Sequence, residues 1–436
     1  MSSMIPVGYE MRERIEMKYG KILHNYGEQV KKNLGYYNLG DAIQTIGIEY
    51  IYKKMGIEDE QIVEIEVNNL KTYEGEYVLL PMYSVAVGIG FAELPLSPKI
   101  IPLFISTHVA KNNLNEMEIS YLRQYAPIGC RDEYTLQIMK KNNILAYLSG
   151  CLTAVMPKLE GINENGKVFF VDVPEKIFDY IPTEIKSNME ITTHMVDIPK
   201  RTMKKEDAYD NYNKSKKQLE KYYKQAKMVV ASKQHALIPC LAAGIPVVAV
   251  VENISQRFSW FDKYIKIYSE NEFQNIDWNP KPVEYEYMKE RLFKLFSTQI
   301  RQAYEKYSLL YEISDFYENR EKSIYGSSYR NKIKSVEEKI KKKNSYVIWG
   351  CGLIGNTVYD IMTENYPDLN LKVAVDNFVT GTWHDVDVVK ATELEKYTDS
   401  FIILATYSGK EECIRKMREL KLVDTVDYVY LATQNG

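Results

Sequence analysis

The order of apolar and polar stretches along the chain predicts a protein of alternating strands and helices. Short apolar runs rich in β-branched residues recur, and polar segments with helical spacing separate them. For example, the spacing of Ile43, Ile46 and Tyr50 predicts a helix that ends at Gly56. Such alternation is typical of an α/β fold with mostly parallel sheets.

Three α/β units follow one another along the chain. The first, residues 1–160, contains strand-like runs at 61–67, 76–89 and 99–107 and helical segments at 115–124 and 133–141. We interpret its residues 1–32 as a helical lead-in, with no apolar strand before Asn38. A second Rossmann-like unit occupies residues 161–280, and a helical segment with a linker occupies residues 281–344. A small third unit of the same class covers residues 345–436.

Composition and charge exclude several classes of protein. The 436 residues are 45% hydrophobic and 26% charged, which is typical of a globular protein. A net charge of −3 provides no basic field for nucleic acid. The longest uncharged stretches, Tyr77–Ala92 and Asn142–Pro157, are shorter than the roughly 20 apolar residues of a membrane span. Because the start also lacks an apolar leader, we expect a cytoplasmic protein, free or at the inner face of the membrane.

The five cysteines and the histidines predict no structural metal. No two cysteines form a C-x-x-C pair, so neither a disulfide framework nor a zinc site is expected. Nor do carboxylates and histidines cluster with the spacing of metal ligands.

The third unit carries a dinucleotide-like fingerprint. Gly350, Gly352 and Gly355 follow a strand directly, and Asp376 follows at the end of the next strand. In dinucleotide-binding folds this pattern gives a tight turn, close approach to a pyrophosphate and a carboxylate for the ribose. Three readings stay open: a structural or interaction role, binding of a nucleotide or nucleotide sugar, and NAD chemistry. We expect no redox turnover, and we expect the glycines to allow close packing of strand, turn and helix.

The second unit places Lys233 and His235 between a strand and a helix. Ligands of α/β folds bind at the carboxyl ends of parallel strands, and helix N-termini attract anions. Lys233 adds positive charge, and His235 can exchange a proton near neutral pH. The alternative for His235 is a structural role as a helix-cap residue.

The first unit offers four further candidates at comparable turns. Asn38 and Asp41 precede a helix, although such a loop can simply cap the helix. His108 closes the run PLFIST, where it binds a ligand or only packs. Arg131 follows a short strand and either clamps an anion or pairs with an acidic neighbour.

Five segments in order resemble a known family. They are YYNLGDAIQT, PLFISTH, PIGCRDEYTLQIMKK, YLSGCLTAVMP and SKQHALIPCLAAGIPVVAV, and over residues 35–270 they resemble the polysaccharide pyruvyl transferases. The resemblance implies two lobes facing across a cleft, similar to GT-B glycosyltransferases. It also implies phosphoenolpyruvate as donor, and as acceptor a sugar of a growing surface polysaccharide, including one carried on a lipid-linked oligosaccharide. The family has an arginine, a variable residue and a histidine at a helix start, where this chain has Lys233, Gln234 and His235.

With this donor, the candidates take distinct roles. His235 neutralises the leaving phosphate or supplies a proton, and Asp41 is the base for the acceptor hydroxyl. The remaining residues of the first two units bind substrate: Asn38, His108, Arg131, Lys233 and Arg257. The reaction demands no metal or cofactor. Two alternatives are a glycosyltransferase that uses a nucleotide sugar and a non-catalytic scaffold that docks polysaccharide-assembly enzymes through the third unit.

Overall fold

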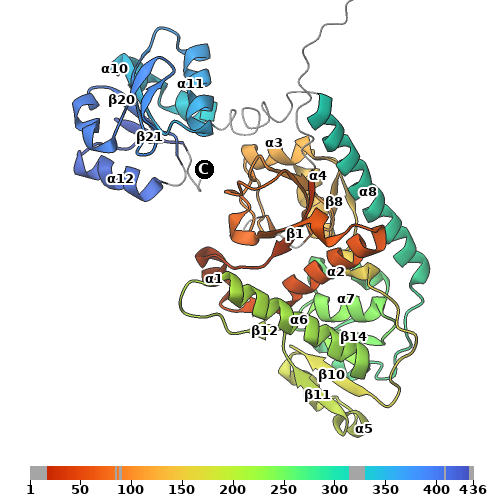
Figure 1. Cartoon of the computed structure of the whole chain (residues 1–436). Coiled ribbons are helices and arrows are strands. Elements are labelled where there is room, and N and C mark those ends of the chain that lie inside the picture. The colour runs from red at the N-terminus through yellow and green to blue at the C-terminus, as the bar shows by residue number, and fades with distance from the viewer. Residues whose placement is uncertain (1–16, 84–85, 88–90, 314–328, 407–408, 432–436) are drawn as a thin grey trace, which may run out of the picture. The chain divides into compact units, whose positions relative to one another are not determined.

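The computed structural model describes residues 17–83, 86–87, 91–313, 329–406 and 409–431. The chain divides into two compact units, unit 1 (Met1–Ile313) and unit 2 (Ser314–Gly436). Strands and helices alternate in both, and most strand pairs are parallel, which confirms the expected α/β class (Figure 1). Among the described residues, no helix combines the length and apolarity needed to cross a membrane.

The first half of unit 1 contains a four-stranded parallel sheet. In spatial order its strands are β3 (Ile62–Glu66), β1 (Lys18–Leu23), β4 (Val78–Pro81) and β6 (Ile100–Leu103). Two short parallel pairs accompany the sheet: β5 (Ala86–Val87) with β7 (His108–Val109), and β8 (Ile128–Cys130) with β9 (Ala146–Leu148). Helices α1 (Glu28–Leu34), α3 (Glu116–Gln124) and α4 (Glu133–Lys141) complete this half.

Strand β1 shows that the expected helical lead-in without a strand before Asn38 is wrong. Its sequence, KYGKIL, has no continuous apolar run, because Lys18 and Lys21 interrupt it. The Lys21 ammonium lies 2.8 Å from the Glu49 carboxylate and 3.7 Å from that of Glu64. These ion pairs neutralise a charge beside the core, so a polar-looking segment occupies an inner position of the sheet.

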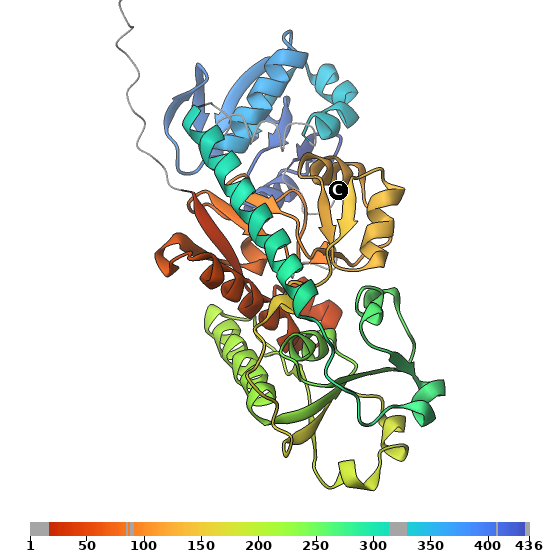
Figure 2. The same ribbon diagram turned by 90° about the vertical axis from the view of Figure 1, so that its right-hand side faces the viewer.

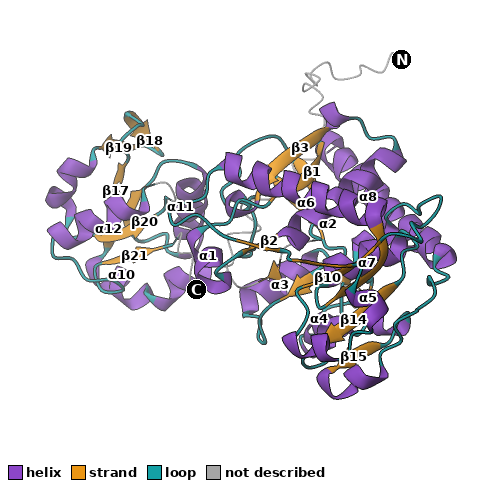
Figure 3. Cartoon of the chain, turned by 90° about the horizontal axis from the view of Figure 1, so that it is seen from below, coloured by secondary structure: helices purple, strands orange, loops and turns teal. Residues whose placement is uncertain are grey.

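The second half of unit 1 is built on a five-stranded parallel sheet. In spatial order its strands are β11 (Met189–Thr192), β10 (Lys167–Val171), β13 (Ala226–Ala231), β14 (Val247–Val251) and β15 (Ile267–Ser269). Their inner positions are apolar and buried, as in a sheet covered on both faces. Helices α5 (Thr183–Lys186), α6 (Lys205–Gln225) and α7 (Gln234–Ala242) surround the strands (Figure 3).

Helix α2 (Leu39–Met55) joins the two halves. It packs against α6 and α7 of the second half, and the residues just before it form β2 (Tyr37–Asn38), which pairs antiparallel with β12 (Met195–Val196). The Leu39 N–H donates to the His194 carbonyl over 2.9 Å, and the Ser215 hydroxyl donates to the Leu39 carbonyl over 3.0 Å. Backbone and side-chain bonds therefore hold the two sheets together at the point where α2 begins.

The long helix α8 (Glu286–Ile313) also runs past both halves (Figure 2). Near its start, Lys289 donates to the Ala242 carbonyl, at the end of α7. Further along, Tyr304 stacks on Tyr19 of β1 with ring centroids 4.3 Å apart. Phe296 and Ile300 are fully buried between these points, so α8 is part of the core of unit 1. Residues 314–328 of the expected linker lie outside the described residues.

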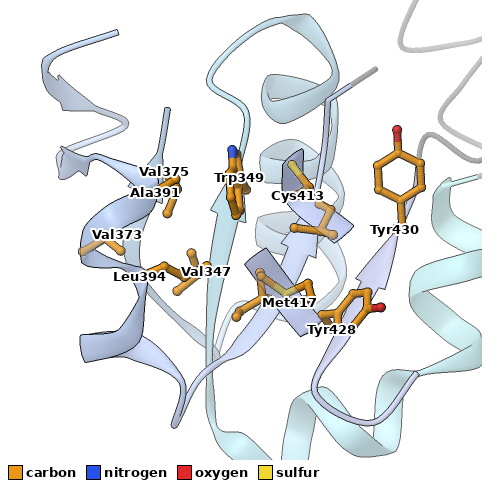
Figure 4. Close-up of a cluster of buried hydrophobic side chains, with 12 residues drawn as sticks. Val347, Trp349, Val373, Val375, Ala391, Leu394, Cys413, Met417, Tyr428 and Tyr430 are labelled. Carbon is orange, nitrogen blue, oxygen red and sulfur yellow. The ribbon is translucent and has the colours of Figure 1, made fainter. Parts of the chain in front are cut away.

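Unit 2 forms a six-stranded, mostly parallel sheet. In spatial order its strands are β18 (Gly381–Trp383), β19 (Val386–Val389), β17 (Asn370–Val375), β16 (Ser345–Trp349), β20 (Phe401–Leu404) and β21 (Tyr428–Tyr430). Helices α10 (Glu337–Lys343), α11 (Leu353–Asn365) and α12 (Lys410–Glu419) accompany it. The buried cluster in Figure 4 includes Val347, Leu394 and Met417. Because α10 falls within the expected linker and buries Ile340, the structured part of unit 2 starts before residue 345.

The glycine loop between β16 and α11 only partly meets our expectation. Gly350 has φ +116°, and a Cβ there would lie 2.5 Å from the Ala405 carbonyl oxygen. A Cβ on Gly355 would lie 1.9 Å from the Gly350 carbonyl oxygen. Apart from its chain neighbours, no described residue has an atom within 4 Å of a Cβ built on Gly352, so the expectation that this glycine serves close packing is wrong.

This difference predicts that alanine substitutions at Gly355 and Gly352 affect the stability of unit 2 differently. Gly355→Ala forces strand and helix apart and should destabilise unit 2 by about 1–3 kcal/mol, the usual cost of overpacking. Scanning calorimetry should then show the unit 2 transition roughly 4 °C or more lower. Gly352→Ala is the matched control and should leave the transition unchanged. Equal effects of the two alanines would contradict the packing found here.

Candidate functional site

A cavity of about 280 Å³ opens in unit 1 beside the start of α2, and both halves line it. Its walls contain every residue of the first two units that the sequence nominated: Asn38, Asp41, His108, Arg131, Lys233, His235 and Arg257. They also contain residues that the sequence did not nominate: Leu34, Tyr36, Phe91, Ala110, His194, Ser232, Gln234, Ser255 and Phe258. Residues more than 200 positions apart in the chain thus meet at one cavity.

The loop before α2 holds Asp41 in place. Asn38 caps the helix, because its Oδ1 accepts the Gly40 N–H over 3.0 Å, and its Nδ2 donates to Asp41 over 3.1 Å. The Tyr26 hydroxyl donates to the other Asp41 oxygen over 2.5 Å. Burial raises the pKa of Asp41 to about 6, although both hydrogen bonds and the charges of Arg131 and Arg257 oppose this shift. A carboxyl with such a pKa can accept a proton near neutral pH.

His235 lies in the first turn of α7, directly against this loop. A Cβ on Gly40 would lie only 2.8 Å from the Nδ1 of His235, so the contact requires glycine. Burial, with the charges of Arg131 and Arg257, lowers the pKa of His235 well below its usual value. The ring is therefore neutral at pH 7 and does not itself supply positive charge to the cavity. Its Nε2 is buried and has no hydrogen-bond partner in the part of the chain that the structure describes.

Three cations line the same cavity. Arg131 is buried; its guanidinium donates to the Gln44 side chain over 3.3 Å and lies 3.8 Å from the Asp132 carboxylate. Lys233 occupies the N-cap of α7, and its ammonium lies 5.7 Å from the centre of the Tyr36 ring. Arg257 belongs to a turn after β14 and is exposed. The ion pair expected as the alternative for Arg131 exists, yet this arginine also faces the cavity.

Asp132 contacts the cavity residues His108 and Arg131, and the sequence analysis did not nominate it. It caps α4 by accepting the Thr135 N–H over 2.9 Å, and its other oxygen lies 2.8 Å from the Nδ1 of His108. Despite complete burial, hydrogen bonds and charges from His108 and Arg131 lower the pKa of Asp132 to about 2. Its place one residue before a predicted helix was a signal for a cap, but not for a contact with a histidine 24 residues away.

His194 was missed as well. Its backbone N–H donates to Asp172 over 2.9 Å, and its Nε2 lies 3.0 Å from the Tyr222 hydroxyl. Within the described residues its Nδ1 has no partner, and burial lowers its pKa to about 4. Because this histidine follows the end of β11, the strand-end rule that nominated His235 would have nominated it too.

The glycine loop and Asp376 belong to unit 2, whereas the described residues that line the cavity belong to unit 1. The Asp376 carboxylate accepts the backbone N–H groups of Cys351, Phe378 and Val379 over 3.0, 2.8 and 3.1 Å. These bonds favour the structural reading of the fingerprint, since a carboxylate that fixes two loops explains Asp376 without a ribose. In the described ranges, no group of three or more histidine, cysteine, aspartate or glutamate side chains is arranged to hold a metal ion.

Comparison with known proteins gives a family match and remote similarity to solved structures. The family model described as polysaccharide pyruvyl transferase matches residues 38–253, which include every predicted cavity residue except Arg257. No curated protein matches the chain. The crystal structure of a functionally uncharacterised protein from Klebsiella pneumoniae covers 59% of this chain and 93% of its own, with 11% identity and a TM-score of 0.34.

The buried histidines predict how the stability of unit 1 depends on pH. The folded-state pKa values of His24, His108 and His194 are lowered to about 3, 4 and 4, and that of His235 is lowered as well. Between about pH 6.5 and 4 the unfolded chain therefore binds more protons, and the free energy of unfolding falls as pH falls. The raised pKa of Asp41 increases the free energy of unfolding as pH falls. We expect the four histidines to outweigh this single carboxyl.

Scanning calorimetry at pH 7, 6 and 5 should show the unit 1 transition moving to lower temperature. His194→Gln should flatten this dependence, and Asp41→Asn should steepen it. A transition temperature that stays constant or rises toward pH 5 would show that these histidines are not buried in the neutral form.

Proposed function

The chain belongs, through residues 38–253, to the polysaccharide pyruvyl transferase family, and we propose that it transfers pyruvate from phosphoenolpyruvate to a sugar as a ketal. Family membership identifies a transferase that modifies surface polysaccharide. The donor, the ketal product and the residue roles below are the proposed part.

The observation that carries the proposal is the cluster of Arg131, Lys233 and Arg257 around one cavity. Phosphoenolpyruvate bears a phosphate and a carboxylate, so it needs more than one cation for binding. The N-terminus of α7 adds the partial positive charge of a helix end on the side of Lys233. The lysine at the family's arginine position keeps the charge, while the planar forks of Arg131 and Arg257 suit the carboxylate and the phosphate.

The reaction requires proton transfers at defined atoms. The methylene carbon of the donor must gain a proton, which makes the adjacent carbon electrophilic, and an acceptor hydroxyl then attacks that carbon. The negative charges of the donor offset those of Arg131 and Arg257, so binding raises the pKa of His235 and lets its Nε2 carry the proton to the methylene carbon. Asp41 receives the proton of the attacking hydroxyl, in keeping with its raised pKa.

In this proposal, unit 1 acts as two lobes in a GT-B-like arrangement. Residues 1–160 contribute Asp41 and His108 on the acceptor side, and residues 161–280 contribute Lys233 and His235 on the donor side. The pairing of β2 with β12 supports this division, because it brings the two sides to one cavity. The residues that line the cavity all belong to unit 1, and the proposal assigns no step of the transfer to the described residues of unit 2.

Phosphate release from phosphoenolpyruvate tests the function with a panel of p-nitrophenyl hexosides as acceptors. The wild-type chain should release phosphate with at least one acceptor. His235→Gln should lower kcat/KM by roughly 10²-fold or more, as expected for lost acid–base catalysis, with little change in Tm. His384→Gln, the same substitution in unit 2, is the matched control and should retain full activity.

A thermal-shift panel separates the alternatives. At about 100 times its Kd, phosphoenolpyruvate should stabilise the chain by about 2.7 kcal/mol, and UDP-hexoses should have no effect. Stabilisation by a UDP-hexose but not by phosphoenolpyruvate would replace the proposal with a glycosyltransferase. No response to either donor would favour the scaffold.

A further inference from the structure

The His108–Asp132 pair has a geometry that fixes which ring nitrogen carries the hydrogen. Asp132 is completely buried and ionised, so its oxygen can only accept the hydrogen bond from the Nδ1 of His108, 2.8 Å away. The other Asp132 oxygen is held by the Thr135 N–H, so the carboxylate cannot rotate freely. A neutral imidazole with its hydrogen on Nδ1 has a lone pair on Nε2.

His108 lines the same cavity as Lys233 and His235 of the donor side. Its Nε2 has no hydrogen-bond partner among the residues that the structure describes, and the side chain is only 10% exposed. Thus a histidine with a fixed tautomer borders the cavity through its ring. Asp132 caps α4 through one oxygen only. The cap therefore does not account for the contact between its other oxygen and His108.

We propose that His108 is the second base of the transfer, accepting a proton from an acceptor hydroxyl at Nε2, and that Asp132 is the positioning residue that holds its tautomer. The inference rests on the proposed function. A ketal consumes two hydroxyls, and the cavity contains two proton acceptors from the first half of unit 1, Asp41 and His108.

The proton balance closes with these groups. When the first hydroxyl attacks, its O–H bond breaks, a C–O bond forms, and its proton passes to Asp41 while His235 protonates the methylene carbon. When the second hydroxyl attacks, its proton passes to the Nε2 of His108, and the bond between the same carbon and the phosphate oxygen breaks. Of the two protons released by the hydroxyls, one restores the proton that His235 gave to the methylene carbon. The second leaves on the released phosphate.

The charges around His108 suggest an order of binding. Burial and the charges of Arg131 and Arg257 lower its pKa to about 4, and Asp132 only partly offsets them. Two further groups in contact with His108, the Thr135 hydroxyl and the Tyr134 ring, are uncharged. Because the anionic donor offsets the two arginine charges, His108 becomes a stronger base once the donor is bound. The donor therefore binds before the acceptor reacts.

The tautomer can be measured without any substrate. The full chain is labelled with ¹⁵N-histidine, and the His108 signals are identified by their loss in His108→Gln. The nitrogen shifts should show hydrogen on Nδ1 and a lone pair on Nε2. In Asp132→Asn the amide can donate to Nδ1, so the hydrogen should move to Nε2, while asparagine still caps α4. A wild-type ring with its hydrogen on Nε2 would overturn the proposal.

Kinetics then tests the consequence. With the best acceptor of the hexoside panel, Asp132→Asn should lower kcat roughly 10²-fold or more and leave KM for phosphoenolpyruvate within about threefold. His108→Gln should also remove the loss of activity at low pH that titration of this base produces. Tyr134→Phe, next to the dyad but outside the cavity walls, is the control and should keep normal kinetics.

The two proposals fail in different ways. If wild type transfers pyruvate and Asp132→Asn does so within threefold of it, the dyad is wrong and the proposed function stands. If wild type uses phosphoenolpyruvate with no acceptor, the proposed function is wrong and the catalytic role of the dyad falls with it, whatever the tautomer.

Discussion

The contact between the first turns of α2 and α7 is the constraint on which the site depends. Gly40 lies so close to His235 that even a methyl group would collide with the ring. One residue away, Leu39 bonds to the backbone of His194, and β2 pairs with β12. The two sheets are therefore tied together beside the cavity that both halves line.

The cavity brings together buried polar atoms that lack hydrogen-bond partners. Arg131 is buried, and its Nε lies 3.8 Å from the Asp132 carboxylate, too far for a hydrogen bond. In the described part of the chain, the Arg131 Nε and the His235 Nε2 have no hydrogen-bond partner. Unpaired buried polar atoms typically cost about 1–3 kcal/mol each. An anionic ligand that accepts a hydrogen bond from the Arg131 Nε recovers part of this free energy, which favours anions in this cavity.

The rule that ligands lie at the carboxyl ends of parallel strands predicted much of the site from sequence. It nominated Lys233 and His235, and it placed Arg131 after a short strand. The rest was missed because it depends on distant contacts. A lysine such as Lys21 argues against a buried strand, because the sequence does not show that Glu49 and Glu64 pair with it. Similarly, the sequence indicates that Asp132 caps a helix, but it does not show that the fold brings His108 beside it. The pattern of glycines also could not show that Gly352, unlike Gly350 and Gly355, has room for a Cβ, because such contacts depend on the folded structure.

The most direct test of the account is a crystal structure of the full chain with phosphoenolpyruvate. The account predicts the donor in the cavity of unit 1, with its phosphate and carboxylate bound by Arg131, Arg257 and Lys233. The pairing of β2 with β12 should remain unchanged. A donor bound elsewhere, or one that enters only after Asn38–Asp41 separates from His194 and His235, would contradict a site preassembled by the contact between α2 and α7.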